Sequence, residues 1–113
     1  MAADCIFCKI IKGEAPANFV YKDEDMVVFH NLRPSAPVHV LIVPVEHIGS
    51  VNALEKRHST VISKMMLKAK EIARTLGISD SGYKLVINVG SGGGQVIFHL
   101  HIHLIGGWAR SET

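Results

Sequence analysis

The sequence predicts an α+β domain in which a mostly antiparallel sheet of about five strands carries one long and one short helix. Short apolar and β-branched runs follow one another with brief connections, which favours antiparallel pairing. One segment near the middle of the chain has the periodicity of a long amphipathic helix. The length of 113 residues predicts a single domain over residues 1–113, and 48% hydrophobic residues can supply its core.

The first part of the chain is expected to contain a short helix and three strands. Asp4 can cap a helix that ends before Gly13. Residues 19–21 and 26–30 are expected to form two strands around an acidic turn. Residues 38–43 are apolar and β-branched, which predicts a third strand after a loop that contains two prolines.

The second part is expected to contain the long helix and two more strands. Asn52 and Glu55 have the spacing of a capping box, and the apolar residues that follow recur at helical intervals until Gly77. Residues 83–89 predict a strand. A glycine-rich loop follows, and residues 96–105 predict the last strand.

Composition and charge argue against several classes of function. The net charge of +2 is too small to predict a nucleic-acid surface. No run of about 18 apolar residues predicts a membrane span, and the first residues lack the basic and apolar regions of a signal peptide. We therefore expect a cytoplasmic protein with neither nucleic acid nor a membrane among its partners.

Three of the seven histidines fall within five positions, at His99, His101 and His103. They alternate with apolar residues, and successive side chains of a strand point to opposite faces of a sheet. The three imidazoles are therefore expected on one face at intervals of roughly 7 Å. The residues expected in the core on the other face are Phe98, Leu100, Ile102 and Leu104.

Two chemistries suit such a row of histidines. Imidazole is a common metal ligand, and it is also a nucleophile when its neighbours orient it. The glycine-rich loop at residues 90–94 lies just upstream, and its backbone N–H groups can approach a phosphate. A candidate phosphate-binding loop that leads into a histidine strand favours phosphoryl chemistry with a histidine nucleophile.

The chain resembles the histidine-triad nucleotide-binding family over nearly its whole length. The family motif, three alternating histidines followed by two apolar residues, stands at residues 99–105. The ending at residues 104–108 resembles the phosphoramidase branch more than the dinucleoside polyphosphate hydrolase branch. Further matching positions are residues 29–32, 37–44, 46–48 and 93–95, together with Asn88.

The resemblance implies a nucleotide-binding hydrolase that cleaves nucleoside 5′-phosphoramidates or related nucleotidyl conjugates. His101 would attack the phosphorus and form a covalent nucleotidyl-histidine, which water would then hydrolyse to a nucleoside monophosphate. His103 is implied as a phosphate contact and proton donor, with His39 beside it. His99 completes the implied catalytic group, and no cofactor is expected for catalysis.

The resemblance also implies where the purine nucleoside monophosphate, or a conjugate of it, would bind. Apolar side chains would enclose the purine, and Asn31 would bind the ribose hydroxyls. Many relatives carry Ser or Thr after Gln95, whereas Val96 offers only its backbone N–H here. The residues implied around the nucleotide are Phe7, Ile10, Phe29, His30, Asn31, Leu32, Asn88, Gly93, Gly94, Gln95 and Val96.

The two cysteines, Cys5 and Cys8, have a spacing found in metal-binding and redox pairs. Some bacterial relatives bind structural zinc through such a pair and two histidines, and the matching positions here are His47 and His99. Cys2His2 is a closed tetrahedral set that suits a structural zinc. Ordinary core thiols and a redox pair are the alternative interpretations of the cysteines.

The resemblance further implies a homodimer, which we expect to form through the long helix and residues 83–89. Those strand residues are apolar on both faces for most of their length. The tail after Trp108 is short for the phosphoramidase branch, whose tail reaches the partner's site. Three alternative functions stay open: hydrolysis of dinucleoside polyphosphates, regulatory nucleotide binding without catalysis, and metal binding by the triad.

Overall fold

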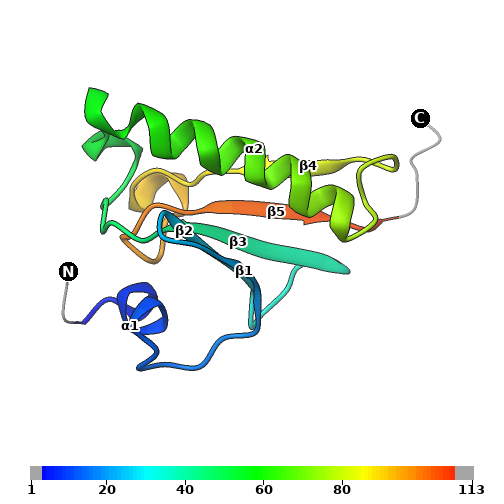
Figure 1. Ribbon diagram of the computed structural model, residues 1–113, viewed down its shortest axis with the longest axis horizontal. Coiled ribbons are helices and arrows are strands. Elements are labelled where there is room, and N and C mark those ends of the chain that lie inside the picture. The colour runs from blue at the N-terminus through cyan, green and yellow to red at the C-terminus, as the bar shows by residue number, and fades with distance from the viewer. Residues whose placement is uncertain (1–3, 109–113) are drawn as a thin grey trace.

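Five antiparallel strands form one sheet in the computed structural model, which describes residues 4–108 (Figure 1). The strand order is β1-β2-β3-β5-β4, so β1 and β4 are the sheet edges. This architecture confirms the predicted α+β class. The strands are β1 (Phe19–Lys22), β2 (Met26–His30), β3 (Val38–Pro44), β4 (Tyr83–Val86) and β5 (Ile102–Gly106), and the helices are α1 (Ile6–Lys12) and α2 (Ser59–Thr75).

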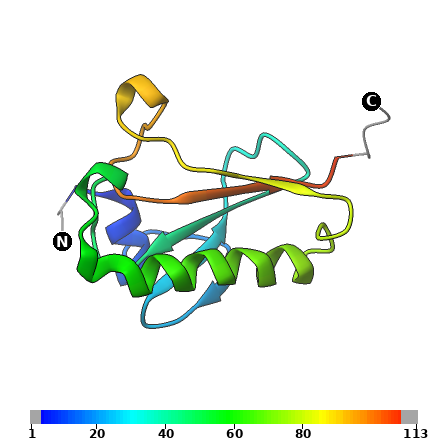
Figure 2. The same cartoon turned by 90° about the horizontal axis from the view of Figure 1, so that it is seen from above.

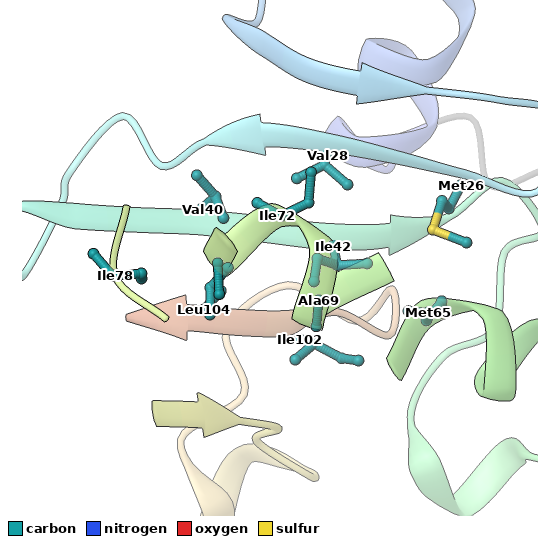
Figure 3. Packing of buried hydrophobic residues seen from close by; sticks show 11 residues of the cluster. Met26, Val28, Val40, Ile42, Met65, Ala69, Ile72, Ile78, Ile102 and Leu104 are labelled. Atoms are coloured by element: carbon teal, nitrogen blue, oxygen red, sulfur yellow. The ribbon is translucent and has the colours of Figure 1, made fainter. Parts of the chain in front are cut away.

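The two helices lie on opposite faces of the sheet (Figure 1). Figure 2 shows the long α2 running alongside the strands. Side chains of α2 that recur at helical spacing pack on the central strands (Figure 3). This main core contains Met26, Val28, Val40, Ile42, Met65, Ala69, Ile72, Ala73, Ile78, Ile102 and Leu104.

A second, smaller core lies on the face that α1 covers. Because side chains alternate along a strand, the neighbours of the main-core residues on β2 and β3 point to this face. The residues of this core are Phe7, Ile10, Val27, Phe29, Leu41 and Val43. No helix among residues 4–108 is long and apolar enough to cross a membrane.

The cap of α1 differs from the expected one. Cys5, not Asp4, is the N-cap residue, and the Cys8 N–H donates to Cys5 Sγ at 3.4 Å. The same bond brings the two sulfur atoms to one side of the helix start. The helix ends at Lys12, and Gly13 follows in a left-handed conformation with φ of 80°, as the sequence predicted.

The start of α2 also differs from the prediction. Asn52 lies in a separate short 3-10 turn, where its N–H donates to Ser50 Oγ, so it caps nothing in α2. A capping box is formed by Glu55 and His58 at the 3-10 turn Lys56–His58, which precedes α2, and the Glu55 N–H donates to His58 Nδ1 at 2.8 Å. His58 is the N-cap of α2 itself and makes no side-chain cap bond there. The sequence placed the box one turn too early because histidine is not a usual partner in that pattern.

The last two strands are shorter than predicted. β4 ends at Val86 instead of residue 89, and β5 begins at Ile102 instead of residue 96. Residues 96–101 leave the sheet, and the Leu100 N–H donates to Ile48 O outside the strand pairs. Strict alternation therefore fails before β5: Phe98, expected in the core, is 50% exposed, whereas Leu100, Ile102 and Leu104 are buried as predicted.

Candidate functional site

A cavity of about 440 Å³ lies on the face of the sheet that carries α1. Its walls come from α1, β2, β3, the start of β5 and the segment that follows β4. Among the described residues that line it, none is acidic and Arg33 is the only one with a permanent charge. Phe7 and Phe29 meet edge to face inside it, with ring centroids 5.6 Å apart. The walls suit a ligand with an apolar ring and an anionic group.

The structure brings most of the residues implied for nucleotide binding and catalysis to this cavity. His39, Gly93, Gln95 and His99 are not among its lining residues. The tail, residues 109–113, lies outside the described part of the chain. The implied residues that line the cavity are Phe7, Ile10, Phe29, His30, Asn31, Leu32, Asn88, Gly94, Val96, His101 and His103.

Sequence reasoning missed some of the lining. Leu41 pairs with both Phe29 and His103 across the sheet, so these three side chains form one row on the cavity face. Strand pairing is the signal that would have found Leu41, but register is not visible in one sequence. The other lining residues that were not predicted are Ile6, Pro16, Ala17, Arg33 and Ile97.

His101 is buried, and a backbone hydrogen bond orients its ring. His101 Nδ1 lies 2.7 Å from the carbonyl oxygen of His99, which can only accept, so Nδ1 carries the proton. Among the described residues Nε2 has no hydrogen-bond partner. Because no fully buried side-chain nitrogen there lacks a partner, Nε2 is accessible from the cavity. Burial lowers the pKa of His101, which keeps Nε2 unprotonated at neutral pH.

His39 and His103 form a hydrogen-bonded pair next to His101. The Ser35 N–H donates to His39 Nδ1 at 3.0 Å, so a neutral His39 carries its proton on Nε2. That nitrogen lies 2.9 Å from His103 Nδ1 and donates to it, which places the His103 proton on Nε2. Asn31 Nδ2 is more distant from His39 Nε2, at 3.2 Å.

The pKa directions agree with this chain of tautomers. Burial lowers the pKa of His39, and burial, together with the repulsion that His101 and His39 would exert on a protonated ring, lowers the pKa of His103 to about 4. Both rings are therefore neutral near pH 7. A neutral His103 presents an N–H at Nε2, a group that can hydrogen-bond a phosphate oxygen.

The glycine-rich loop after β4 is held by its own hydrogen bonds. The N–H groups of Gly93 and Gly94 donate to Gly90 O and Ser91 O. Asn88 Nδ2 donates to Gly93 O at 2.9 Å. The amides that were expected near a phosphate are thus already bonded within the loop.

Four side chains from three distant segments meet at the start of α1. Cys5, Cys8, His47 and His99 place one ligand atom each within 4.8 Å of one another. Cys5 Sγ lies 3.4 Å from His99 Nδ1, and Cys8 Sγ lies 3.3 Å from His47 Nδ1. Zinc bonds of about 2.0–2.3 Å place tetrahedral ligands about 3.3–3.8 Å apart. The cysteine–histidine distances of 3.3, 3.4 and 3.6 Å lie in this range, and the remaining pairs, within 4.8 Å, would close slightly around a tetrahedral zinc.

His99 links this cluster to the cavity. Its Nε2 lies 2.8 Å from Pro44 O and donates to it, so Nδ1 is left free of a proton and faces the two sulfur atoms. Burial lowers the pKa of His99 to about 4, which keeps the ring in the neutral form that a metal requires. The carbonyl of the same residue accepts the His101 N–H.

Known proteins resemble this chain over nearly all of its length. Residues 4–112 match the family described as "Scavenger mRNA decapping enzyme C-term binding". Protein HitA of Neisseria gonorrhoeae is 48% identical over 103 residues, which cover 91% of this chain and 95% of HitA. The purine nucleoside phosphoramidase of Escherichia coli is 40% identical over 107 residues, covering 95% of this chain and 90% of the relative.

Solved structures have the same fold. A HIT family hydrolase from Legionella pneumophila superposes with a TM-score of 0.92 at 42% identity, over 96% of this chain and 97% of that one. A zinc-bound histidine triad family protein from Mycobacterium smegmatis gives 0.78 at 28% identity, over 90% and 73% of the two chains. With its intact His-x-His-x-His motif at residues 99–103, the chain therefore belongs to the histidine-triad family.

Proposed function

We propose that this chain is a nucleotide-binding hydrolase that cleaves nucleoside 5′-phosphoramidates or related nucleotidyl conjugates and releases a nucleoside monophosphate. The observation that carries the proposal is the orientation of His101, whose Nδ1–H is held by His99 O while Nε2 is left as a free nucleophile beside the cavity. The HIT family hydrolase and purine nucleoside phosphoramidase among its relatives support the same class of reaction.

In the first step, His101 Nε2 donates its lone pair to the 5′-phosphorus and a P–N bond to the imidazole forms. The bond between phosphorus and the leaving amine breaks, and the amine takes up one proton from solvent, while the His103 Nε2–H hydrogen-bonds a phosphate oxygen. The neutral state of both rings suits these two roles, since one must have a free lone pair and the other an N–H.

In the second step, water attacks the phosphorus of the nucleotidyl-histidine. The P–N bond to His101 breaks, nucleoside monophosphate leaves, and one proton of the attacking water returns to solvent. His39 takes no proton in this scheme; it holds His103 in the tautomer that carries its proton on Nε2. The purine would lie between apolar side chains such as Phe7 and Ile10, with the ribose near Asn31.

Two alternatives use the same cavity. A dinucleoside polyphosphate hydrolase would expel a nucleotide instead of an amine, and a regulatory module would bind nucleotide without turnover. Steady-state rates with an adenosine phosphoramidate, a guanosine phosphoramidate and a dinucleoside polyphosphate distinguish them. We expect the phosphoramidates to react fastest; a preference for the polyphosphate, or no turnover of any substrate, would favour one of the alternatives.

We further propose one structural zinc held by Cys5, Cys8, His47 and His99. The distances and the neutral His99 ring support this assignment, as does the zinc-bound relative. When bound, the metal would supply a rigid cross-link between α1, the segment after β3 and the triad, and no reaction step uses it. A protein whose thiols serve as zinc ligands also suits the cytoplasm, where we place this chain.

The sheet edge supports a homodimer as the working form. Within residues 4–108 one edge of β4 pairs with no other strand, and Leu85 in β4 and Ile87 just after it are 36% and 40% exposed. On α2, Leu67 is 61% exposed. An apolar strand with an unpaired edge tends to pair with another chain. We propose a second copy of this chain as the partner, through the long helix and residues 83–89.

Replacing the nucleophile should separate catalysis from binding. We expect His101→Ala to lower kcat by at least about a thousandfold while the Kd for adenosine 5′-monophosphate changes by less than about tenfold, because the nucleophile acts in the chemical step. Rapid-quench kinetics and calorimetry measure the two quantities. A variant that retains more than about a tenth of the wild-type rate would remove His101 from this role.

The pH dependence of the reaction should reflect the lowered histidine pKa values. An imidazole stays neutral at every pH above its own pKa. Lowering that pKa below the ordinary value of about 6.5 therefore extends the neutral form to lower pH in the folded protein. We therefore expect the acid limb of kcat/KM to lie below pH 6.5, with the pKa of about 4 at His103 as its lower bound. An acid limb centred at or above the ordinary value would contradict the assigned protonation states.

Removing zinc should loosen α1 before it affects nucleotide chemistry. We expect about one zinc per chain in protein purified without a chelator or a histidine tag, and a lower Tm after Cys8→Ser or chelation. Hydrogen exchange should rise first in residues 6–12. Lys9→Ala, an α1 change outside the cluster, is the control for helix stability. Zinc below about a tenth of an equivalent after reconstitution, with both thiols reactive, would reduce the cysteines to ordinary core residues.

The dimer should depend on the apolar residues at the sheet edge. Sedimentation should give twice the chain mass of 12.3 kDa at micromolar concentration. Ile87→Asp should shift the protein toward monomer, because a charge would be buried without a partner. Asn18→Asp adds the same charge at an exposed position beside β1, the opposite edge of the sheet, and should leave the mass unchanged. A wild-type monomer at this concentration would overturn the proposal.

A further inference from the structure

Gln95 has a buried side-chain amide whose hydrogen bonds are all made inside the protein. The residue is 4% exposed, although amides usually prefer the surface. Its Oε1 accepts from the Gly90 N–H at 2.9 Å, and its Nε2 donates to Gly49 O at 2.9 Å and Ile97 O at 3.0 Å. With its capacity used in this way, the amide has little left to offer a ligand.

One end of this amide closes the glycine-rich loop. Gly90 donates to the Gln95 side chain, and the backbone N–H of Gln95 donates back to Gly90 O at 3.0 Å. Gly90 has φ of 71°, a conformation that disfavours any other residue. The two reciprocal bonds fix both ends of the turn, so the path of residues 90–95 depends on Gln95.

The other end ties the loop to a segment that belongs to a different part of the site. Gly49 follows His47, one of the four clustered metal-type ligands, by two residues. The carbonyl of its neighbour Ile48 accepts the N–H of Leu100 at 2.6 Å, and Leu100 lies between His99 and His101 in the sequence. The same short segment therefore holds both the glycine-rich loop, through Gln95, and the approach to β5.

The position of the loop matters because its outer side forms one wall of the cavity. Gly94 and Val96, the sequence neighbours of Gln95, line the same cavity as His101 and His103. We propose that Gln95 is a positioning residue: it anchors the glycine-rich loop to the segment at Gly49 so that the backbone N–H of Val96, which is not bonded within the loop as those of Gly93 and Gly94 are, faces the phosphate group of the substrate. The phosphate ligand in this statement rests on the proposed function.

Hydrogen exchange of the ligand-free protein tests the anchor directly. Gln95→Met keeps the length of the side chain and removes all three hydrogen bonds. We expect exchange at residues 88–96 to rise at least about tenfold while β2 and β3 keep their protection, and the Kd for adenosine 5′-monophosphate to rise at least about tenfold. Unchanged exchange in this loop, or an unchanged Kd beside faster exchange, would overturn the proposal.

Two further variants separate positioning from general stability. Gln95→Glu keeps the acceptor for the Gly90 N–H but replaces the Nε2 donor by an oxygen that faces Gly49 O and Ile97 O. Hydrogen exchange of this variant therefore tests the anchor at Gly49 and Ile97 alone. Exchange as slow as in the wild type would show that this anchor does not hold the loop. Ile72→Val weakens the core under α2, away from the loop, and should lower the Tm without raising the Kd.

The readouts distinguish this inference from the proposed function. If wild-type protein fails to bind adenosine 5′-monophosphate, the proposed function fails and exchange still decides whether Gln95 anchors the loop. If wild type and Gln95→Met bind it equally well, the proposed function stands and the positioning role is wrong. An equal rise in Kd for Ile72→Val at matched Tm would likewise reduce Gln95 to a structural residue.

Discussion

The hydrogen bond between His101 Nδ1–H and the backbone carbonyl of His99 is the constraint on which the candidate site depends. A neutral imidazole has one donor and one acceptor, so fixing the donor on a backbone oxygen fixes the acceptor at Nε2. The ring of His99 is itself held at both nitrogens, by Pro44 O and by the cysteine sulfurs. The orientation of His101, the proposed nucleophile, is therefore set by His99, Pro44 and the cysteines, which are not among the described residues that line the cavity.

Burial serves this arrangement on both faces of the sheet. The face under α2 is a packed apolar core, which makes the central strands β3 and β5 rigid supports for the side chains on the other face. On the cavity face, burial disfavours the charged imidazolium and keeps His39, His101 and His103 neutral. Rigid support and neutral rings together let a hydrogen-bond chain define where each proton lies.

The sequence predicted the sheet, both helices and the metal-type cluster because each has a local or family signal. Periodicity revealed α2, and the cysteine spacing with matching histidines indicated the cluster. Long-range bonds were not predictable: no local pattern shows that Leu100 N–H reaches Ile48 O, and this bond belongs to the stretch where alternation fails and Phe98 turns outward. The same limit hid the buried amide of Gln95, whose partners lie up to 46 residues away.

The proposed mechanism requires that His101 attacks phosphorus and carries the nucleotidyl group between the two steps. Mass spectrometry of enzyme quenched during a single turnover of an adenosine phosphoramidate tests it most directly. We expect the peptide that contains His101 to gain one nucleotidyl group through an acid-labile P–N bond. No adduct on that peptide, together with oxygen-18 evidence for direct attack of water on the substrate, would contradict the claim.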